Sequence, residues 1–310
     1  MRVELSNMRT ICKMNLKIGN TPIIELTKEI RAKNGVRIFA KMENANDGGS
    51  IKSRVAVAMV QDAEKKGVLK KGGTIVEATS GNTGVGLALV GKSKGYKARI
   101  YLPENMQGDK SAKMESYGAE VVLTPAVQGM AGAVRAAESF VQTHPNAYYA
   151  NQFCNPVCAA VHYQTTGVEI WAQTQGGSDI FTAGFGTGGT ISGVGKYLKE
   201  KKPTLQVVGV EPASSPLLSK GYSGAHGIKG IGANFLPSVL NKSVIDEVLL
   251  VTDSEAEEWS ARLKKDLGLS VGISSGAAFC ACLRLAEMPQ NAGKRIVTIF
   301  PDGGGRYALE

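Results

Sequence analysis

A glycine-rich segment, Gly184-Phe185-Gly186-Thr187-Gly188-Gly189-Thr190, follows an apolar run and precedes a stretch of helical character. Glycines let backbone N–H groups converge without obstruction by Cβ atoms, and the start of a helix adds positive potential. Such a turn can hold a phosphate. Its spacing matches neither the G-x-x-x-x-G-K nucleotide loop nor the G-x-G-x-x-G dinucleotide fingerprint. Alone, the segment predicts either an anion site or a tight turn without a ligand.

A second segment of this kind is Thr79-Ser80-Gly81-Asn82-Thr83-Gly84, which also lies between an expected strand and an expected helix. It offers hydroxyl groups, an amide and backbone donors at one helix N-terminus, and these groups suit a carboxylate. Two anion sites in one chain indicate that a substrate and a cofactor both carry negative charge.

Lys52 lies in a glycine-serine turn, Gly48-Gly49-Ser50-Ile51-Lys52-Ser53-Arg54, just before the expected helix 55–66. A lysine in a confined position can have the pKa of its amine lowered, and the neutral amine is the form that makes a Schiff base. Taken by itself, Lys52 is more simply interpreted as a surface lysine at a helix start.

The elements that must position these segments alternate along the chain, which predicts an α/β fold with mostly parallel sheets. Expected strands are 74–79, 99–102, 120–123, 179–185, 206–210 and 294–300, and expected helices are 85–94, 110–117, 130–141, 191–199 and one that ends near 267. Ser254 and Glu257 are expected to form a capping box at the start of that last helix. The two strand–glycine loop–helix units indicate two lobes, residues 1–50 with 159–310 and residues 51–158.

Composition argues against several other classes of protein. The net charge of +9 comes from scattered lysines with few aromatic residues among them, which disfavours a nucleic-acid surface. There is no apolar run long enough for a membrane span, and residues 1–17 lack the apolar core of a signal peptide. The five cysteines and three histidines lack the spacing of a disulfide framework or a metal site, so we expect no metal and a cytoplasmic location.

With these segments in this order, the chain resembles the cysteine synthase/cystathionine β-synthase family of fold-type-II pyridoxal-phosphate enzymes. The resemblance extends from Gly19-Asn20-Thr21-Pro22 to Gly305-Arg306-Tyr307. Its most specific motifs are Ser50 to Arg54, Thr79 to Gly84, Gly186 to Thr190 and Gly272-Ile273-Ser274-Ser275-Gly276. It implies a two-lobed fold like that of the tryptophan synthase β chain, pyridoxal 5′-phosphate as the cofactor and a homodimer.

The resemblance also implies roles for individual residues. Lys52 matches the lysine that forms the Schiff base, and Asn82 matches the residue bonded to the ring hydroxyl of the cofactor. The residues that match the cofactor-phosphate loop are Gly186, Thr187, Gly188, Gly189 and Thr190. The residues that match substrate-carboxylate contacts are Thr79, Ser80, Asn82, Thr83 and Gln152. The larger lobe would thus hold the cofactor phosphate and the smaller lobe the substrate carboxylate.

Ser274 matches the serine that faces the pyridine nitrogen of the cofactor. A serine hydroxyl can donate to a neutral pyridine nitrogen, whereas an aspartate would hold a proton there and make a stronger electron sink. A weaker sink limits carbanion side reactions, so loss of a leaving group from Cβ competes well. The implied course is removal of the Cα proton by Lys52, elimination to an aminoacrylate and addition of a nucleophile at Cβ.

Within the family, three stretches favour the branch that makes L-cysteine from O-acetyl-L-serine and sulfide: Gln152-Phe153, His162 to Trp171, and Gly227 to Ala233. The family also implies that the C-terminal tail of serine acetyltransferase is a partner.

Departures from the family pattern keep other reactions open. Asp47 stands where proline or alanine is usual, Ser53 where aspartate is common, and Asn234 where glycine is usual. The alternatives are β-elimination or β-replacement on cysteine, serine or O-phosphoserine, with Lys229 as the candidate cation for a phosphate leaving group. An alternative of another class is a non-catalytic anion-binding or regulatory protein.

Overall fold

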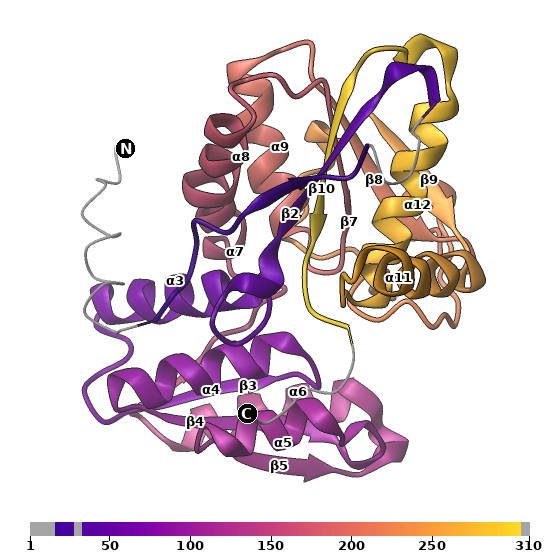
Figure 1. Cartoon of the computed structure of the whole chain (residues 1–310). Coiled ribbons are helices and arrows are strands. Elements are labelled where there is room, and N and C mark those ends of the chain that lie inside the picture. Colours follow the sequence, from indigo (N-terminus) through magenta and orange to yellow (C-terminus); the bar gives the residue numbers. More distant parts are fainter. Residues whose placement is uncertain (1–15, 28–32, 305–310) are drawn as a thin grey trace. The chain divides into compact units, whose positions relative to one another are not determined.

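The computed structural model describes residues 16–27 and 33–304, and these residues fold into two compact units. The described part of the first unit is 16–19 with 45–155, and that of the second is 20–27 and 33–44 with 156–304. Each unit is built on its own sheet (Figure 1). The Gly305-Arg306-Tyr307 end of the resemblance lies outside the described residues.

The first unit contains a four-stranded parallel sheet in the order β5-β4-β3-β6. Its strands are β3 (Thr74–Ala78), β4 (Lys97–Pro103), β5 (Glu120–Thr124) and β6 (Ala147–Tyr149). Its helices are α3 (Lys52–Lys65), α4 (Asn82–Lys94), α5 (Asp109–Ser116) and α6 (Gly129–Thr143), with 3₁₀ turns η4 (Glu104–Met106) and η5 (Ala126–Gln128).

Side chains of β3 alternate between the two faces of this sheet, as the pleat of a strand requires. Val76 and Ala78 pack against Ala133 and Ala137 of α6. The intervening residue Glu77 therefore points to the opposite face, on which α4 packs. This alternation places a carboxyl group beneath the start of α4.

The second unit contains a six-stranded sheet in the order β1-β2-β10-β7-β8-β9, in which β1 alone runs antiparallel to its neighbour. Its strands are β1 (Ile23–Glu25), β2 (Arg37–Met42), β7 (Ile180–Gly184), β8 (Gln206–Pro212), β9 (Glu247–Val251) and β10 (Arg295–Phe300). Its helices are α7 (Val157–Val161), α8 (Gly167–Gln173), α9 (Gly189–Lys201), α10 (Leu217–Lys220), α11 (Asp253–Leu267) and α12 (Ile273–Glu287). A π-helical turn, η6 (His162–Thr166), joins α7 to α8. Short 3₁₀ turns are η2 (Lys33–Gly35), η3 (Glu43–Ala45), η7 (Lys242–Val244) and η8 (Pro289–Asn291).

Helices cover both faces of this second sheet, with α8 and α9 on one side and α11 and α12 on the other (Figure 1). The core on the α12 side includes Phe279 and Phe300, whose rings meet edge to face with their centroids 6.3 Å apart. The α/β fold with mostly parallel sheets flanked by helices is confirmed.

The predicted capping box at Ser254 and Glu257 was wrong. Helix α11 begins at Asp253, and its cap is Thr252, whose Oγ1 accepts a hydrogen bond from the N–H of Glu255. The Glu255 carboxylate in turn accepts from the N–H of Thr252 at 2.9 Å. Thr252 has the extended backbone conformation that an N-cap needs, whereas Ser254 already lies inside the helix.

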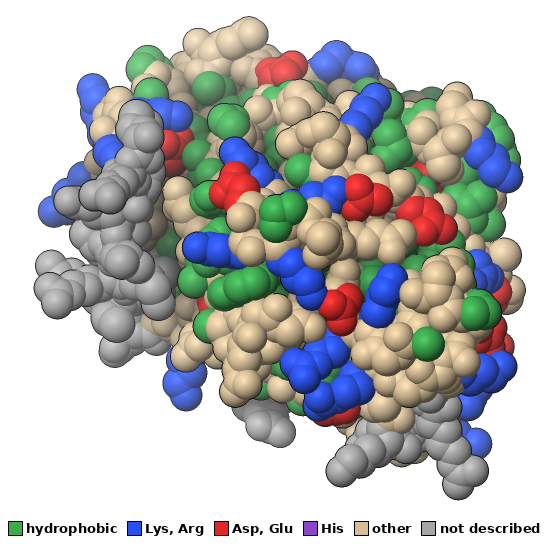
Figure 2. All heavy atoms as spheres, turned by 90° about the horizontal axis from the view of Figure 1, so that it is seen from above, with side chains coloured by type: hydrophobic (Ala, Val, Ile, Leu, Met, Phe, Trp, Pro, Cys, Tyr) green, Lys and Arg blue, Asp and Glu red, His purple; other side chains and the backbone are tan. Residues whose placement is uncertain are grey.

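Charged side chains are dispersed. Lysine and arginine side chains lie among acidic, apolar and neutral polar ones on the face drawn in Figure 2. Within residues 16–27 and 33–304, no helix combines the length and the apolar composition needed to cross a membrane.

Candidate active site

The predicted carboxylate loop lies between the end of β3 and the start of α4, with Gly81 as the N-cap of the helix. Thr79 Oγ1 accepts a hydrogen bond from the N–H of Gly81 at 3.1 Å, which tightens the turn. The N–H groups of Ser80 and Thr83, and the Ser80 hydroxyl, have no hydrogen-bond partner in the described part of the chain. Unpaired donors at a helix N-terminus suit an anion.

Gln152 reaches this loop from the segment after β6. Its side chain is buried, and its Oε1 accepts a 2.6 Å hydrogen bond from the hydroxyl of Thr83. Its Nε2 has no acceptor among the residues that the structure describes. An amide nitrogen that has no acceptor beside this loop fits the expected contact with a substrate carboxylate. The structure thus brings Gln152 to the loop that contains Thr79, Ser80, Asn82 and Thr83.

Glu77 was not among the predicted site residues, although it lies directly behind them. It is 1% exposed, its Oε1 accepts from the N–H of Ala78 at 3.0 Å, and its Oε2 accepts from the N–H of Gln152 at 3.2 Å. Burial raises the pKa of Glu77 from its ordinary value of 4.5 to about 8. The available signal in the sequence was a single acidic residue within the apolar run Ile75-Val76-Glu77-Ala78.

Lys52 is the first residue of α3, which begins earlier than the expected helix 55–66, and its side chain is half-buried. The start of α3 packs closely on α4, since a Cβ added at Gly86 would lie 3.1 Å from the carbonyl oxygen of Lys52. The backbone N–H of Lys52 donates to Ser50 Oγ at 3.3 Å. Asp47 and Ser53, both departures from the family pattern, contact one another, because the hydroxyl of Ser53 in the first turn of α3 donates to the carbonyl oxygen of Asp47.

The predicted phosphate loop in the second unit connects β7 to α9, which begins at Gly189. Gly188 has φ +81°, a left-handed conformation, and a Cβ on Gly186 would lie only 2.5 Å from the carbonyl oxygen of Gly230. Both positions therefore require glycine. The N–H groups of Gly186, Thr187 and Gly188 have no acceptor within the described residues. Together with the first turn of α9, they fit a phosphate group.

His162 is a further residue that sequence reasoning missed. It is 1% exposed in the π-helical turn, with its Nε2 3.3 Å from Thr190 Oγ1 and its Nδ1 2.9 Å from Thr166 Oγ1. The turn can approach α9 because Gly193 has no side chain, and a Cβ there would lie 2.7 Å from the backbone nitrogen of Tyr163 and 2.9 Å from Cβ of His162. His162 thus fixes the hydroxyl of Thr190 at the end of the phosphate loop.

Ser274 lies in the first turn of α12 and is 5% exposed. Its hydroxyl has no hydrogen-bond partner among residues 16–27 and 33–304, and a Cβ built on Gly230 would lie 3.9 Å from its oxygen. A hydroxyl that makes no hydrogen bond within these residues is free to donate to an external acceptor such as a ring nitrogen. Ser274 and the phosphate loop both lie next to Gly230, which places these two expected contacts in one region of the second unit.

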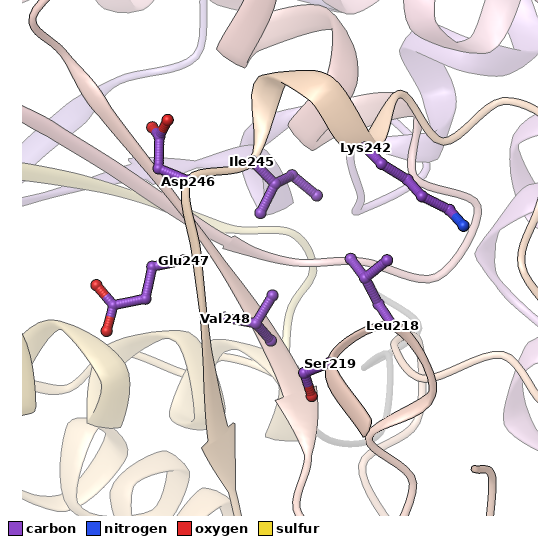
Figure 3. A pocket seen from close by; sticks show the side chains of 7 residues that line it. All are labelled: Leu218, Ser219, Lys242, Ile245, Asp246, Glu247 and Val248. Atoms are coloured by element: carbon purple, nitrogen blue, oxygen red, sulfur yellow. The ribbon is translucent and has the colours of Figure 1, made fainter. Parts of the chain in front are cut away.

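A separate open pocket lies beside the edge strand β9 (Figure 3). It is lined by Leu218, Ser219, Lys242, Ile245, Asp246, Glu247 and Val248, and it contains no predicted site residue. The Asp246 carboxylate is already engaged by Lys199 Nζ at 2.5 Å and by the N–H of Val207 at 2.7 Å.

Within the first unit, the donors at the start of α4 fit a carboxylate, and the half-buried Lys52 lies at the start of α3. Within the second unit, the glycine-rich turn before α9 and Ser274 fit the phosphate and the ring of a cofactor. Residues 14–302 match the family model described as pyridoxal-phosphate dependent enzyme, and the chain belongs to this family. The predicted cofactor, pyridoxal 5′-phosphate, is confirmed at the level of the family.

Individual relatives make the similarity more specific. The chain is 44% identical over 291 residues to a cysteine synthase of Staphylococcus aureus, covering 94% of this chain and 93% of the relative. A crystal structure of a cysteine synthase from Entamoeba histolytica is 39% identical, with a TM-score of 0.90 over 99% of this chain and 90% of that chain. A hydrogen sulfide-producing enzyme from Fusobacterium nucleatum is 39% identical, with a TM-score of 0.88 over 95% of this chain and 97% of that chain. The predicted resemblance to the cysteine synthase/cystathionine β-synthase family is confirmed.

Proposed function

We propose that this chain forms L-cysteine from O-acetyl-L-serine and sulfide by pyridoxal-phosphate-dependent β-replacement. The observation that carries the proposal is the 44% identity to a cysteine synthase over 94% of the chain. The unpaired donors of the two loops and of Gln152 support it, because O-acetylserine has a carboxylate and the cofactor has a phosphate.

In this proposal the second unit holds the cofactor phosphate through Gly186 to Thr190, and Ser274 donates to the ring nitrogen. Lys52 attaches the cofactor covalently, and Asn82 contacts its ring hydroxyl. When bound, pyridoxal phosphate supplies an electron-withdrawing ring that acidifies the Cα–H of an attached amino acid. The neutral hydroxyl of Ser274 keeps this withdrawal moderate, which favours loss of a β-substituent.

The substrate carboxylate is held by the first unit through the Ser80 and Thr83 N–H groups, the Ser80 hydroxyl and the amide of Gln152. Thr79 contributes by closing the turn around Gly81. A fixed carboxylate leaves the Cα proton and the β-substituent in defined directions. The amine of Lys52 would serve as the base for the Cα proton and would return that proton when the product forms.

The direct test is the rate of cysteine formation from O-acetylserine and sulfide by the purified protein, with O-phosphoserine and serine as alternative donors. The proposal expects kcat/KM to be highest for O-acetylserine. Preference for O-phosphoserine, lost in a Lys229→Ala variant, would instead assign a phosphoserine-dependent enzyme. Absence of turnover with every donor would leave the non-catalytic alternative.

A second activity, release of sulfide from L-cysteine, is favoured by one observation: the similarity to the hydrogen sulfide-producing enzyme of F. nucleatum. Asn234 is exposed in the segment after Gly232, where its amide can hold a water molecule. Sulfide release from cysteine, compared between the wild type and Asn234→Gly, tests this role. An unchanged ratio of the two activities would exclude Asn234 as its determinant.

A homodimer, binding of the serine acetyltransferase C-terminal tail and a cytoplasmic location belong to the same proposal. The family resemblance supports the first two, and the spacing of the five cysteines, which lacks the pattern of a disulfide framework, supports the third. Sedimentation of the holoenzyme, alone and with a synthetic peptide of that tail, would test the first two directly. Fluorescence microscopy of a tagged chain in its own host would test the third.

A further inference from the structure

Glu77 is a fully buried carboxyl group that no step of the proposed reaction uses. It points toward the α4 face of the sheet, and its neighbour in the register of β4 is the apolar residue Ile100. Desolvation has the largest effect on its pKa and raises it, whereas the hydrogen bonds from the backbone N–H groups of Gln152 and Ala78 lower it. Retaining an acid here without a cation is costly, which calls for an explanation.

The carboxyl group holds the chain at the point where β6 stops pairing. The ladder continues one bond beyond β6, from the N–H of Ala150 to the carbonyl oxygen of Val76 at 2.9 Å. Asn151 then adopts φ +46°, a left-handed conformation that turns the chain. The next N–H is that of Gln152, and it is donated to Glu77 Oε2 at 3.2 Å. Glu77 therefore fixes the backbone of Gln152 immediately after the turn.

From Gln152 the contacts lead to the loop at α4. Its Oε1 is taken by the Thr83 hydroxyl at 2.6 Å, so its Nε2 is left with a defined direction and no acceptor within the described chain. We propose that Glu77 is a positioning residue for the substrate carboxylate, acting through the backbone of Gln152 on the donor that Gln152 presents. This inference rests on the proposed function of the loop, and it identifies the residue that positions Gln152 against that loop.

Ionisation of Glu77 is expected to make the binding of a carboxylate at this loop depend on pH. Tyr149 of β6 is paired with Val76 and packs on the α6 face of the sheet, opposite to Glu77, and its pKa is raised by desolvation first and by Glu77 second. From β4 the neighbour is Ile100, and from α4 it is the neutral Thr83 loop. With a pKa of about 8, Glu77 is mostly neutral at pH 7 and becomes an anion above pH 8. A second negative charge behind a carboxylate site weakens the binding of a carboxylate.

The test is calorimetric binding of L-alanine and of L-alaninamide to the holoenzyme. L-alanine has a carboxylate but no β-leaving group, so its binding does not require the proposed reaction. L-alaninamide shares the amine and lacks the charge. Glu77→Ala is expected to weaken L-alanine binding about tenfold or more, the effect of losing an oriented hydrogen bond to a charged group. Binding of L-alaninamide should change less than about threefold.

Glu77→Gln is the second variant, and it tests the proposal even if the alanine variant does not fold. A glutamine reproduces the neutral acid, with one oxygen still able to accept from Gln152. It should bind L-alanine as the wild type does at about pH 7 and should lack the additional loss of affinity that the wild type shows above about pH 8. Glu115→Gln makes the same chemical change at an exposed site of α5 and should behave as the wild type.

Two results would overturn the proposal: wild-type affinity for L-alanine in Glu77→Ala, or identical pH profiles for the wild type and Glu77→Gln. Equal losses for L-alanine and L-alaninamide in Glu77→Ala would also overturn it, because the effect would not concern the carboxylate. Failure of the cysteine synthase proposal would appear separately, as absent turnover of O-acetylserine with L-alanine binding intact.

Discussion

The hydroxyl of Thr83 donates a 2.6 Å hydrogen bond to Oε1 of Gln152, and this contact joins the first turn of α4 to the chain that follows β6. Both side chains are buried, so the hydrogen bond does not compete with bulk water. It fixes which end of the Gln152 amide is available as a donor. The orientation of the carboxylate site therefore depends on a pair of residues 69 positions apart in the sequence.

Thr83→Val should raise KM for O-acetylserine about tenfold, because it removes the hydroxyl that orients Gln152 while keeping the shape of the side chain. Gln152→Ala should have a similar effect, and the double variant should be little worse than either single variant, since the two side chains act as one unit. Thr83→Ser retains the hydroxyl and is the control. Fully additive effects on log KM would contradict a shared role.

Glu77 should make the stability of the folded protein depend on pH. Its pKa is raised from 4.5 to about 8 on folding, so the folded state favours the protonated acid, and stability falls as pH rises between these values. Each pH unit in that window costs up to about 1.4 kcal/mol, or roughly 2–4 °C in Tm. The Tm of Glu77→Gln relative to the wild type should rise with pH across the window and level off above about pH 8. A constant difference measured by scanning calorimetry would be inconsistent with a buried titrating group.

His162→Phe should weaken cofactor binding about fivefold, because it removes the ring nitrogen next to the Thr190 hydroxyl and leaves the buried volume nearly filled. Thr190→Val should do the same, with no further loss in the double variant. Fluorescence titration of the apoprotein with pyridoxal phosphate measures the effect. His144→Phe changes an exposed histidine and is the control. Unchanged affinity in a folded His162→Phe protein would assign His162 to packing alone.

The strand–glycine loop–helix segments could be predicted because their determinants are local. Apolar β-branched residues, then glycines, then helix-forming residues mark β3 to α4 and β7 to α9, and both helices occur where expected, although they begin earlier. The motif around Lys52 was recognised for the same reason. The start of α11 was predicted two residues too late. Thr252 and Ser254 are both acceptable caps by residue type, and the backbone conformation decides between them.

Glu77 and His162 could not be assigned from the sequence because their roles arise from tertiary contacts. Glu77 meets Gln152 only because β3 and β6 are neighbours in the sheet, and His162 meets Thr190 only because Gly193 lets the π-helical turn approach α9. The residues next to a single glutamate in a strand, or next to a single histidine in a helix, do not indicate which distant residue it contacts. The roles of Lys52, the phosphate loop, Ser274 and the carboxylate loop stay predictions that the geometry of each unit accommodates.

The central claim is that the amine of Lys52 carries the cofactor and moves the substrate proton. Borohydride reduction of the holoenzyme followed by peptide mass spectrometry tests it most directly, with Lys52→Ala as the comparison. The account predicts a pyridoxyl adduct on the Lys52 peptide of the wild type, and neither adduct nor cysteine formation in the variant. An adduct on another lysine of the wild type, or normal turnover by Lys52→Ala, would contradict it.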